Sequence, residues 1–527
     1  MSIGRRPLLG ALSLLPFVGA GAVAVSSHGS PGLRELIRPE EAAQPGALTR
    51  WTEGPLTVPD EVLGSGQSDD DFRVIPPSTA VGVSAIALEE DSSLLFGRVS
   101  SSTTRQDAQG DPLAPSIELV DEDGGESTAP PTELGYGALG LLAPDLEAGA
   151  QVTLAAADGS RPVGDAVQTT LTETGDFRSL SLSRMLSPRV DASFLGAGTL
   201  RGSTSVLVLR NVSPRPATAS VQVWTADGPA EMQGRSRIVV AAGETAQLLL
   251  DTVIAGQDAV GLRVVTVGAP LLMHVSTAER DGLTARGAQI LAPLPEPAAE
   301  QLVPGVHLTT PDLVPVLILQ NPRGTDTSAD VTVLGSEGDL GLPGLSGLDL
   351  PAGTVLTVPL PLTVPGDYAV RILAAAPVDA VVRSRVPGPA PAGETLGTPA
   401  DLALAAAAPA LGQGAALALS TLGPVGLLAL VSSADTTATV IPLGADGSAG
   451  APVVRPVPAG RLVTVGGTEL RGMNGAAAGL VLSSEGSGRL HAAWVQAEHD
   501  PALGGLLSTI PVLPPARELA SLSVHLR

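Results

Sequence analysis

The stretch Leu-Val-Leu-Arg-Asn at positions 207–211 recurs as Leu-Ile-Leu-Gln-Asn at 317–321 and, more loosely, as Leu-Ala-Leu-Val-Ser at 428–432. The copies lie about 110 residues apart, which is a period that indicates a repeated fold unit. Each stretch alternates apolar residues in the way that a half-buried strand does. Because these stretches share their pattern and carry no reactive side chain in common, the repeat points to a scaffold.

The segments that follow each copy match as well. An alternating strand over 220–224, 330–334 and 439–443 is followed by Asp227-Gly228, Glu337-Gly338 and Asp446-Gly447 respectively. An Ala-Gly pair comes later in each copy, at 242–243, 352–353 and 459–460. An acidic residue followed by glycine after an alternating strand is a strong hairpin signal. The sequence therefore predicts three copies of one all-β unit.

Composition sets limits on the class of protein. The chain has 527 residues and is 44 % hydrophobic but only 2 % aromatic, so its cores are built from Leu, Val, Ala and Ile. That length suits several domains rather than a single core. All 30 basic residues are arginine, a usage typical of GC-rich genomes.

Net charge argues against one group of partners. The formal charge is −23, so nucleic acids and anionic lipid headgroups would be repelled, and we expect no nucleic-acid partner. The chain contains no cysteine, which excludes disulfides, thiolate metal sites and cysteine nucleophiles.

The N-terminus has the features of a targeting segment. Arg5 and Arg6 precede an uncharged apolar run over residues 7–25. This run is just long enough to span a bilayer, so residues 1–26 are expected to be a signal anchor with the bulk of the chain outside the membrane. Ala22-Val23-Ala24 resembles a cleavage site, so cleavage and secretion stay open as the alternative.

The remaining organisation follows from proline content and strand spacing. We expect a Pro-rich stalk over 27–78, an N-terminal β domain over 79–195, repeats over 196–300, 301–412 and 413–515, and a tail over 516–527. The 79–195 domain could be a diverged fourth copy, because Ala157-Asp158-Gly159 resembles the turn of the other copies. A helix is expected at most over 400–408.

Six or seven short strands per hundred residues predict an immunoglobulin-like β-sandwich in each repeat. The fold class is therefore all-β, with tandem immunoglobulin-like sandwiches behind an N-terminal transmembrane or signal segment. We expect the sandwiches to be strung one after another, because propeller blades repeat at only about 40–50 residues.

The strongest candidate metal ligands are His491, His499 and Asp500. Alignment of the copies argues against them, because His491 takes the place of Leu272 and His499 the place of Arg280. Two residues eight apart on one strand are also separated by about 26 Å. We therefore expect no metal site here.

Other candidate sites have structural interpretations. The acidic run at 121–126 has the ligands for calcium, but its spacing favours a solvated hairpin tip. The glycine-rich run at 196–202 has the wrong spacing for a phosphate loop and is followed by a strand. Trp224 and Trp494 align with Leu or Val in other copies, so we expect packing positions rather than sugar platforms. No catalytic, cofactor-binding or metal residue is therefore expected, and no cofactor.

Three motifs resemble a known family. They are Thr-Gly-Asp-Phe-Arg-Ser-Leu at 174–180, Ser-Phe-Leu-Gly-Ala-Gly-Thr at 193–199, and Val-Leu-Arg-Asn-Val-Ser at 208–213 with Pro-Ala-Thr at 216–218. They are similar to an actinobacterial family, domain of unknown function 5719, and the resemblance covers roughly 80–515. The chain departs from that family in lacking cysteines and in having Phe194 where a tryptophan is usual. The resemblance implies an envelope protein without assigned activity, so no site residues carry over.

The function that these observations favour is a non-catalytic structural or interaction protein of the cell envelope. Its modules would lie outside the membrane, held by one span, and its partner would be an unknown envelope protein or polymer. The alternative is an envelope hydrolase or a carbohydrate-binding protein whose site is formed by residues distant in sequence.

Overall fold

The computed structural model describes residues 46–58, 77–100 and 114–515, apart from gaps at 122–124, 129–135, 147–148, 158, 233, 282–283, 390–396, 413, 421, 424, 471–476 and 499–503. The signal anchor expected over 1–26 and the tail expected over 516–527 lie outside these ranges. Within them, no helix is long and apolar enough to cross a bilayer. The described chain is all-β, with short 3₁₀ turns such as η2 (Ser93–Phe96) and η3 (Leu250–Thr252).

The first module, residues 48–184, has two antiparallel sheets with the orders β5-β2-β7-β8 and β1-β6-β3-β4. Its strands are β1 (Leu48–Trp51), β2 (Ala80–Leu88), β3 (Ser116–Asp121), β4 (Glu126–Thr128), β5 (Ala138–Ala143), β6 (Ala150–Ala155), β7 (Val163–Thr172) and β8 (Ser179–Arg184). Strand β1 comes from the segment expected to be a stalk, and it pairs with β6 in the register Leu48↔Leu154. Residues 48–51 are therefore part of a sandwich and not of a stalk.

The second module, residues 191–291, repeats this arrangement with sheets β14-β10-β16-β17 and β9-β15-β11-β12, with β13 also paired to β11. Its strands are β9 (Asp191–Ala197), β10 (Ser203–Arg210), β11 (Ala217–Thr225), β12 (Gly228–Ala230), β13 (Arg237–Val240), β14 (Thr245–Leu249), β15 (Val260–Gly268), β16 (Leu272–Asp281) and β17 (Thr284–Leu291).

The third module, residues 298–406, differs in one respect. Its long strand β24 pairs with β18 and β20 through its first half and with β19 and β25 through its second half, so one strand serves both sheets. The strands are β18 (Ala298–Leu308), β19 (Val316–Gln320), β20 (Thr327–Gly335), β21 (Gly338–Asp339), β22 (Leu348–Leu350), β23 (Val355–Pro359), β24 (Gly366–Pro387) and β25 (Ala400–Ala406). Strand β25 lies within residues 400–408, the only segment where the sequence left a helix possible, so that segment forms a strand instead.

The fourth module, residues 414–511, has sheets β30-β27-β32-β33 and β26-β31-β28-β29. Its strands are β26 (Gly414–Ala418), β27 (Leu427–Ser432), β28 (Thr436–Gly444), β29 (Val453–Val457), β30 (Leu462–Gly466), β31 (Ala477–Gly486), β32 (Leu490–Glu498) and β33 (Leu506–Pro511). The strand pairing is thus the same in all four modules. The three predicted repeats share one topology, and the N-terminal β domain is a fourth copy.

The strand order within a module is not that of an immunoglobulin domain. In immunoglobulin constant domains the strands C, F and G share a sheet, so the sixth and seventh strands are neighbours. Here the sixth strand, such as β15, pairs with the first and third, whereas the seventh, such as β16, pairs with the second and eighth in the opposite sheet. The modules are therefore β-sandwiches of two four-stranded antiparallel sheets, and the immunoglobulin-like expectation is wrong with respect to strand order.

The repeated sequence motifs fix the ends of strands. Asn211 and Asn321 are fully buried and donate hydrogen bonds from Nδ2 to carbonyl oxygens, Asn211 to those of Arg215 and Val240 and Asn321 to those of Thr325, Leu350 and Pro351. The Ala-Gly pairs lie in the turn before the fifth strand, where Gly243, Gly353 and Gly460 have φ values of 76°, 67° and 66°. This left-handed conformation favours glycine, which explains why the residue recurs.

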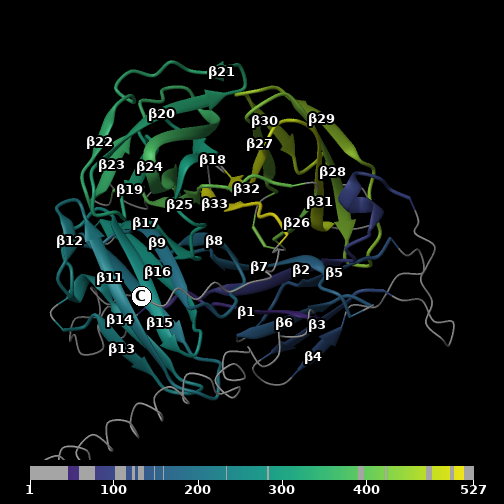
Figure 1. Ribbon diagram of the computed structural model, residues 1–527, viewed down its shortest axis with the longest axis horizontal. Helices are drawn as coiled ribbons and strands as arrows, with labels where there is room; N and C mark the ends of the chain where they lie inside the picture. The colour runs from purple at the N-terminus through teal and green to yellow at the C-terminus, as the bar shows by residue number, and fades with distance from the viewer. Residues whose placement is uncertain are drawn as a thin grey trace, which may run out of the picture. The chain divides into compact units, whose positions relative to one another are not determined.

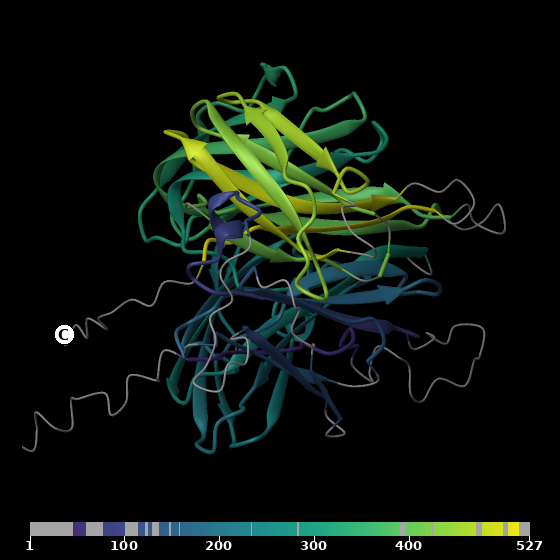
Figure 2. The same cartoon turned by 90° about the vertical axis from the view of Figure 1, so that its right-hand side faces the viewer.

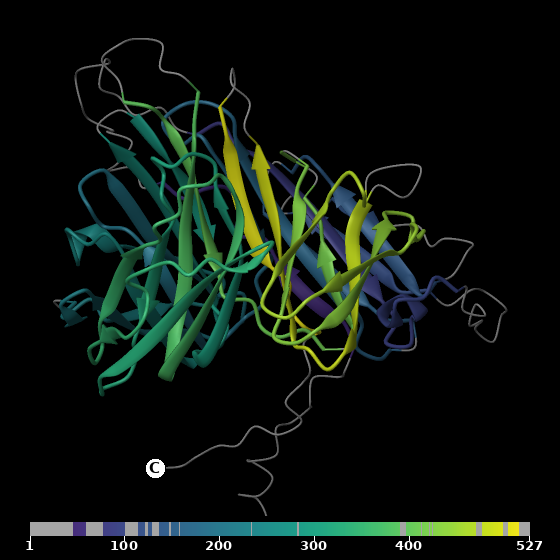
Figure 3. The ribbon, with the colours of Figure 1, turned by 90° about the horizontal axis from the view of Figure 1, so that it is seen from above.

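Each module packs against the next, and the fourth packs against the first. Buried apolar clusters join the first module to the second, the second to the third, the third to the fourth and the fourth to the first. Figure 2 shows strands of the first module (blue) beside those of the fourth (yellow), and Figure 3 shows the third (green) beside the fourth. The strung arrangement expected from the sequence is therefore wrong for the described residues.

The last strands of the four modules lie together (Figure 1), and each contacts the next: β8 with β17, β17 with β25, β25 with β33, and β33 with β8. A cycle of side-chain to backbone hydrogen bonds follows the same order. The backbone N–H groups of Ile290, Leu404, Leu507 and Leu182 donate to Ser181, Gln289, Asp401 and Ser508 at 2.9, 2.6, 2.9 and 2.8 Å. We call β8, β17, β25 and β33 the closing strands.

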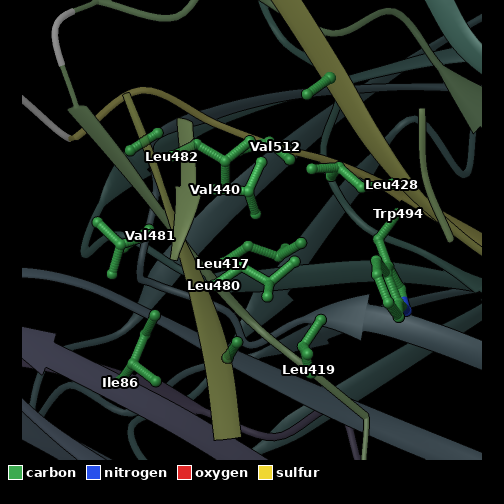
Figure 4. Packing of buried hydrophobic residues seen from close by; sticks show 14 of the residues in the cluster. Ile86, Leu417, Leu419, Leu428, Val440, Leu480, Val481, Leu482, Trp494 and Val512 are labelled. Carbon is green, nitrogen blue, oxygen red and sulfur yellow. The ribbon is translucent and has the colours of Figure 1, made fainter. Parts of the chain in front are cut away.

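The contact between the first and fourth modules is closely packed (Figure 4). Ile86 of β2 lies beside Val481 and Leu480 of β31. A Cβ atom on Gly479 would lie only 2.6 Å from a methyl group of Ile86. The glycine therefore permits the two modules to approach, and a larger residue there would force them apart.

Candidate functional site

A cavity of about 1210 Å³ lies where the four closing strands end. Its lining includes the residues at or just after the end of each strand, namely 182–187, 289–296, 404–410 in part, 509–511 and 513–515. All four modules therefore contribute to one cavity. Ligand sites in proteins are concave and commonly lie at domain interfaces, so this cavity is the candidate functional site.

One wall of the cavity is basic. Arg50, Arg161, Arg184 and Arg189 all line it, and all four belong to the first module or the segment directly after it. Arg184 forms a two-point ion pair with Asp165, with distances of 2.6 and 3.1 Å, and also donates to the carbonyl oxygen of Pro511 at 3.1 Å. Arg184 is thus already neutralised and joins the first module to the fourth.

Arg50 is different. Its guanidinium is half-buried and donates to the carbonyl oxygen of Thr49, and among the described residues no carboxylate forms an ion pair with it. Burial lowers the pKa of Arg50, Asp165 opposes that shift, and the neighbouring Arg161, Arg184 and Arg189 lower the pKa further. Arg161, Arg184 and Arg189 therefore lie near Arg50, with which they line the same cavity.

Backbone contacts hold this wall in place. Trp51 and Leu186 exchange two hydrogen bonds, with N–O distances of 2.9 and 2.7 Å, which sets Arg50 beside the segment that carries Arg184 and Arg189. Arg189 and Leu271 exchange two more, at 2.8 and 2.9 Å, and these tie the same segment to the second module. The basic wall is therefore fixed at both ends.

The other walls are mainly apolar. The second, third and fourth modules contribute Leu291, Leu404, Ile510 and Leu513 among other apolar residues, and η2 of the first module contributes Phe96. Glu90 and Glu296 also line the cavity, and both are exposed to solvent. The cavity thus combines a cationic wall with apolar walls.

Three buried carboxyl groups have raised pKa values, and none of them lines this cavity. Burial raises the pKa of Asp401 to about 7, that of Asp379 to about 7 and that of Glu53 to about 8. Asp401 belongs to the closing hydrogen-bond cycle, and Asp379 lies near Arg263 at the contact between the second and third modules. Asp401 and Asp379 therefore lie at contacts between modules.

The candidate metal ligands are not brought together in the described structure. The Nδ1 atom of His491 lies 2.8 Å from the carbonyl oxygen of Ala408, and burial lowers the pKa of this histidine. His499 and Asp500 lie outside the described residues. Within the described ranges, no three His, Cys, Asp or Glu side chains form a group that could hold a metal ion.

The other candidate motifs lie in turns. The acidic run at 121–126 connects β3 to β4, where Asp121 accepts a hydrogen bond from the backbone N–H of Gly125 at 2.6 Å; residues 122–124 lie outside the description. The run at 196–202 joins β9 to β10, as expected for a turn into a strand. Trp224 and Trp494 are buried, and Trp494 pairs with Leu428 as Val275 pairs with Leu207.

Sequence reasoning missed the arginine cluster. Arg50 falls in the segment expected to be a stalk, and Arg161 lies in a loop far from Arg184 and Arg189 in the chain. No local motif joins them. The pairing of β1 with β6 and of Trp51 with Leu186 brings them together, and neither pairing has a local signal.

Comparison with known proteins gives a family and little else. The model of DUF5719, a family of unknown function, matches residues 142–466. No curated protein matches. Among solved structures, the tetra-tandem repeat in the extending region of a large adhesion protein is similar at 12 % identity, covering 77 % of this chain and 92 % of that one. Its TM-score is 0.09, so that likeness supports no argument about this protein.

Proposed function

Because the chain belongs to DUF5719, a family of unknown function, we propose from its architecture that it is a non-catalytic structural or interaction protein of the cell envelope. Its four sandwich modules would act as one rigid body outside the membrane and would present the cavity to a partner. The observation that carries this proposal is the closing cycle of hydrogen bonds, which orders the ends of four strands around a single cavity.

Sequence features support the location. Arg5 and Arg6 before the apolar run at 7–25 would keep the N-terminus inside and the modules outside. The use of arginine with no lysine suits an origin in a GC-rich actinobacterium. Protease added to intact spheroplasts should then digest the modules, and full protection would contradict the external location.

A crosslinking experiment tests the interaction itself. Phe96 lines the cavity and is 47 % exposed, so a photoreactive benzoylphenylalanine at this position would face a bound partner. Val454 on β29 is 53 % exposed and does not line the cavity, which makes it a matched control. We expect a specific crosslinked product from position 96 in living cells and none from position 454.

Two results would contradict the proposal. Equal crosslinking from positions 96 and 454, or none from either, would argue against the cavity as the interaction surface. Release of soluble sugar or peptide fragments when the purified protein is incubated with envelope material would contradict a non-catalytic role and favour the hydrolase alternative.

A further inference from the structure

We propose that the cavity binds a phosphate monoester attached to an apolar body, with the phosphate against Arg50 and Arg189. This inference rests on the proposed function, because it names the ligand class that the interaction cavity would take. It depends on three features of the cavity, which are its unpaired positive charge, its fixed basic wall and its apolar remainder.

The charge of the basic wall is only partly neutralised by the protein. Asp165 forms an ion pair with Arg184, so the charge of Arg184 is balanced. In the part of the chain that is described, no carboxylate forms an ion pair with Arg50 or Arg189. Two cationic groups, the half-buried Arg50 and the exposed Arg189, therefore line the cavity without an ion-paired carboxylate among the described residues, although the chain has a net charge of −23.

A phosphate monoester suits this arrangement better than a carboxylate. It carries about two negative charges near neutral pH, and the guanidinium fork binds phosphate oxygens in two-point geometry. A carboxylate would neutralise only one of the two arginines. The exposed Glu90 and Glu296 would repel an anion, but water and salt screen charges at such positions, as they also screen the exposed Arg189.

The apolar walls indicate that the phosphate is not free. Leu291, Leu404, Ile510 and Leu513 come from three different modules and face the same cavity as the arginines. Burial of an alkyl or similar body against them would strengthen binding with each CH₂ group that leaves water. Inorganic phosphate would use the basic wall alone and should bind more weakly.

Titration calorimetry on the purified full chain tests the proposal with dodecyl phosphate below its micelle concentration. We expect saturable binding of one molecule per chain, weakened at least about tenfold in the double variant Arg50→Gln/Arg189→Gln. The double variant Arg235→Gln/Arg237→Gln removes the same charge from exposed positions away from the cavity and should bind as the parent does. Inorganic phosphate and dodecanol should each bind at least about tenfold more weakly than dodecyl phosphate.

The source of the phosphate is decided by competition. Vesicles of phosphatidic acid in phosphatidylcholine that displace dodecyl phosphate would support a lipid-borne phosphate, and vesicles that do not would support a soluble monoester. Thermal unfolding separates loss of binding from loss of folding. The Arg50→Gln/Arg189→Gln variant should stay folded yet lose the rise in Tm that dodecyl phosphate gives the parent.

The proposal would be overturned if dodecyl phosphate did not saturate, if dodecanol bound equally well, or if the cavity variant bound as the parent does. Any of these results alongside specific crosslinking from position 96 would remove the ligand class and leave the interaction function intact. If position 96 gave no crosslink but dodecyl phosphate still bound, the interaction function would be contradicted and the ligand class would stand.

Discussion

The carboxylate of Asp401, on closing strand β25, accepts a hydrogen bond from the backbone N–H of Leu507 on β33 at 2.9 Å. The same oxygen accepts a second from Leu180 on β8 at 3.1 Å. One fully buried side chain therefore joins the first, third and fourth modules. The N–H groups of Leu507 and Leu180 donate to Asp401 and not to a neighbouring strand. This carboxyl group therefore helps to decide how the modules close.

The titration of Asp401 should make stability depend on pH. Burial raises its pKa to about 7 from an ordinary value of 3.8, so between these values the folded protein holds a proton that the unfolded chain releases. Its contribution is fully present below about pH 4 and is lost as pH rises through about 7. The free energy of unfolding should fall over this window by up to about 1.4 kcal/mol per pH unit for this group.

Urea unfolding of Asp401→Asn between pH 4 and 8 measures this effect. The Asn side chain of the variant cannot ionise. The slope of the free energy of unfolding against pH should therefore become smaller by the amount that corresponds to about one proton. Glu337→Gln, at an exposed position, should leave the slope as it is. An unchanged slope in Asp401→Asn would show that this carboxyl group is not the one that titrates.

Loss of the Arg383 ion pair should weaken the contact between the second and third modules. Arg383 is 4 % exposed and binds both carboxylate oxygens of Asp258 at 2.9 Å. Removing one partner of a buried pair typically costs about 3–5 kcal/mol, and we expect about 3 for Arg383→Met because Asp258 is partly exposed. Guanidinium unfolding measures this cost. In the control Arg263→Met both the arginine and its partner Asp191 are exposed, so the loss should be below about 1 kcal/mol, and equal losses would contradict the prediction.

The buried Asn211 and Asn321 should contribute equally to the free energy of unfolding. Asn321→Ala removes three donated hydrogen bonds and one accepted from the backbone N–H of Arg323, which leaves buried carbonyl groups unpaired. We expect a loss of about 2–4 kcal/mol, and a similar loss for Asn211→Ala in the second module. Thr325→Ala, at an exposed position nearby, serves as the control. A cost for only one asparagine, measured by calorimetric unfolding, would argue against their equivalence.

Closure of the first module on the fourth can be trapped by a disulfide. The hydroxyl oxygens of Thr169 and Ser420 lie 2.7 Å apart, although 251 residues separate them. The chain has no native cysteine, so Thr169→Cys/Ser420→Cys should form a single bond under mild oxidation. The closed loop should migrate faster on a non-reducing gel at low protein concentration.

A second pair controls for the chemistry. Thr79 and Thr172 have hydroxyl oxygens 2.9 Å apart within the first module, so Thr79→Cys/Thr172→Cys should crosslink in a closed or a strung arrangement. If that pair forms its disulfide and the pair from positions 169 and 420 does not, the strung arrangement is favoured.

Local structure could be predicted from the sequence where its cause is local. The hairpin signals at Asp227-Gly228 and Glu337-Gly338 correspond to tight turns, with glycine φ values of 117° and 110°. The exchange of Trp494 with Val275 identified a packing position correctly. Such features depend on alternation and on glycine at positive φ, which are properties of a few adjacent residues.

Local preference was misleading where tertiary contacts outweigh it. The alanine-rich segment at 400–406 favours a helix by composition, yet it forms β25 because it pairs with β24 and faces its neighbours on the other closing strands. Strand β1 is short and lies among prolines, so only its pairing with β6 identifies it. The segment 79–195 does not include β1, so it lacks the first strand of the module and does not align in full with the other copies.

The sequence by itself determined an all-β chain of repeated units, several of its turns, and the packing positions of Trp224 and Trp494. Only the tertiary structure decided that the order of strands is not immunoglobulin-like, that the fourth module closes on the first, and that Arg50 meets Arg184 and Arg189 at one cavity. The physical reason is that alternation and turn residues act over a few positions. The choice of strand partner and of neighbouring module depends on surfaces formed by residues hundreds of positions apart.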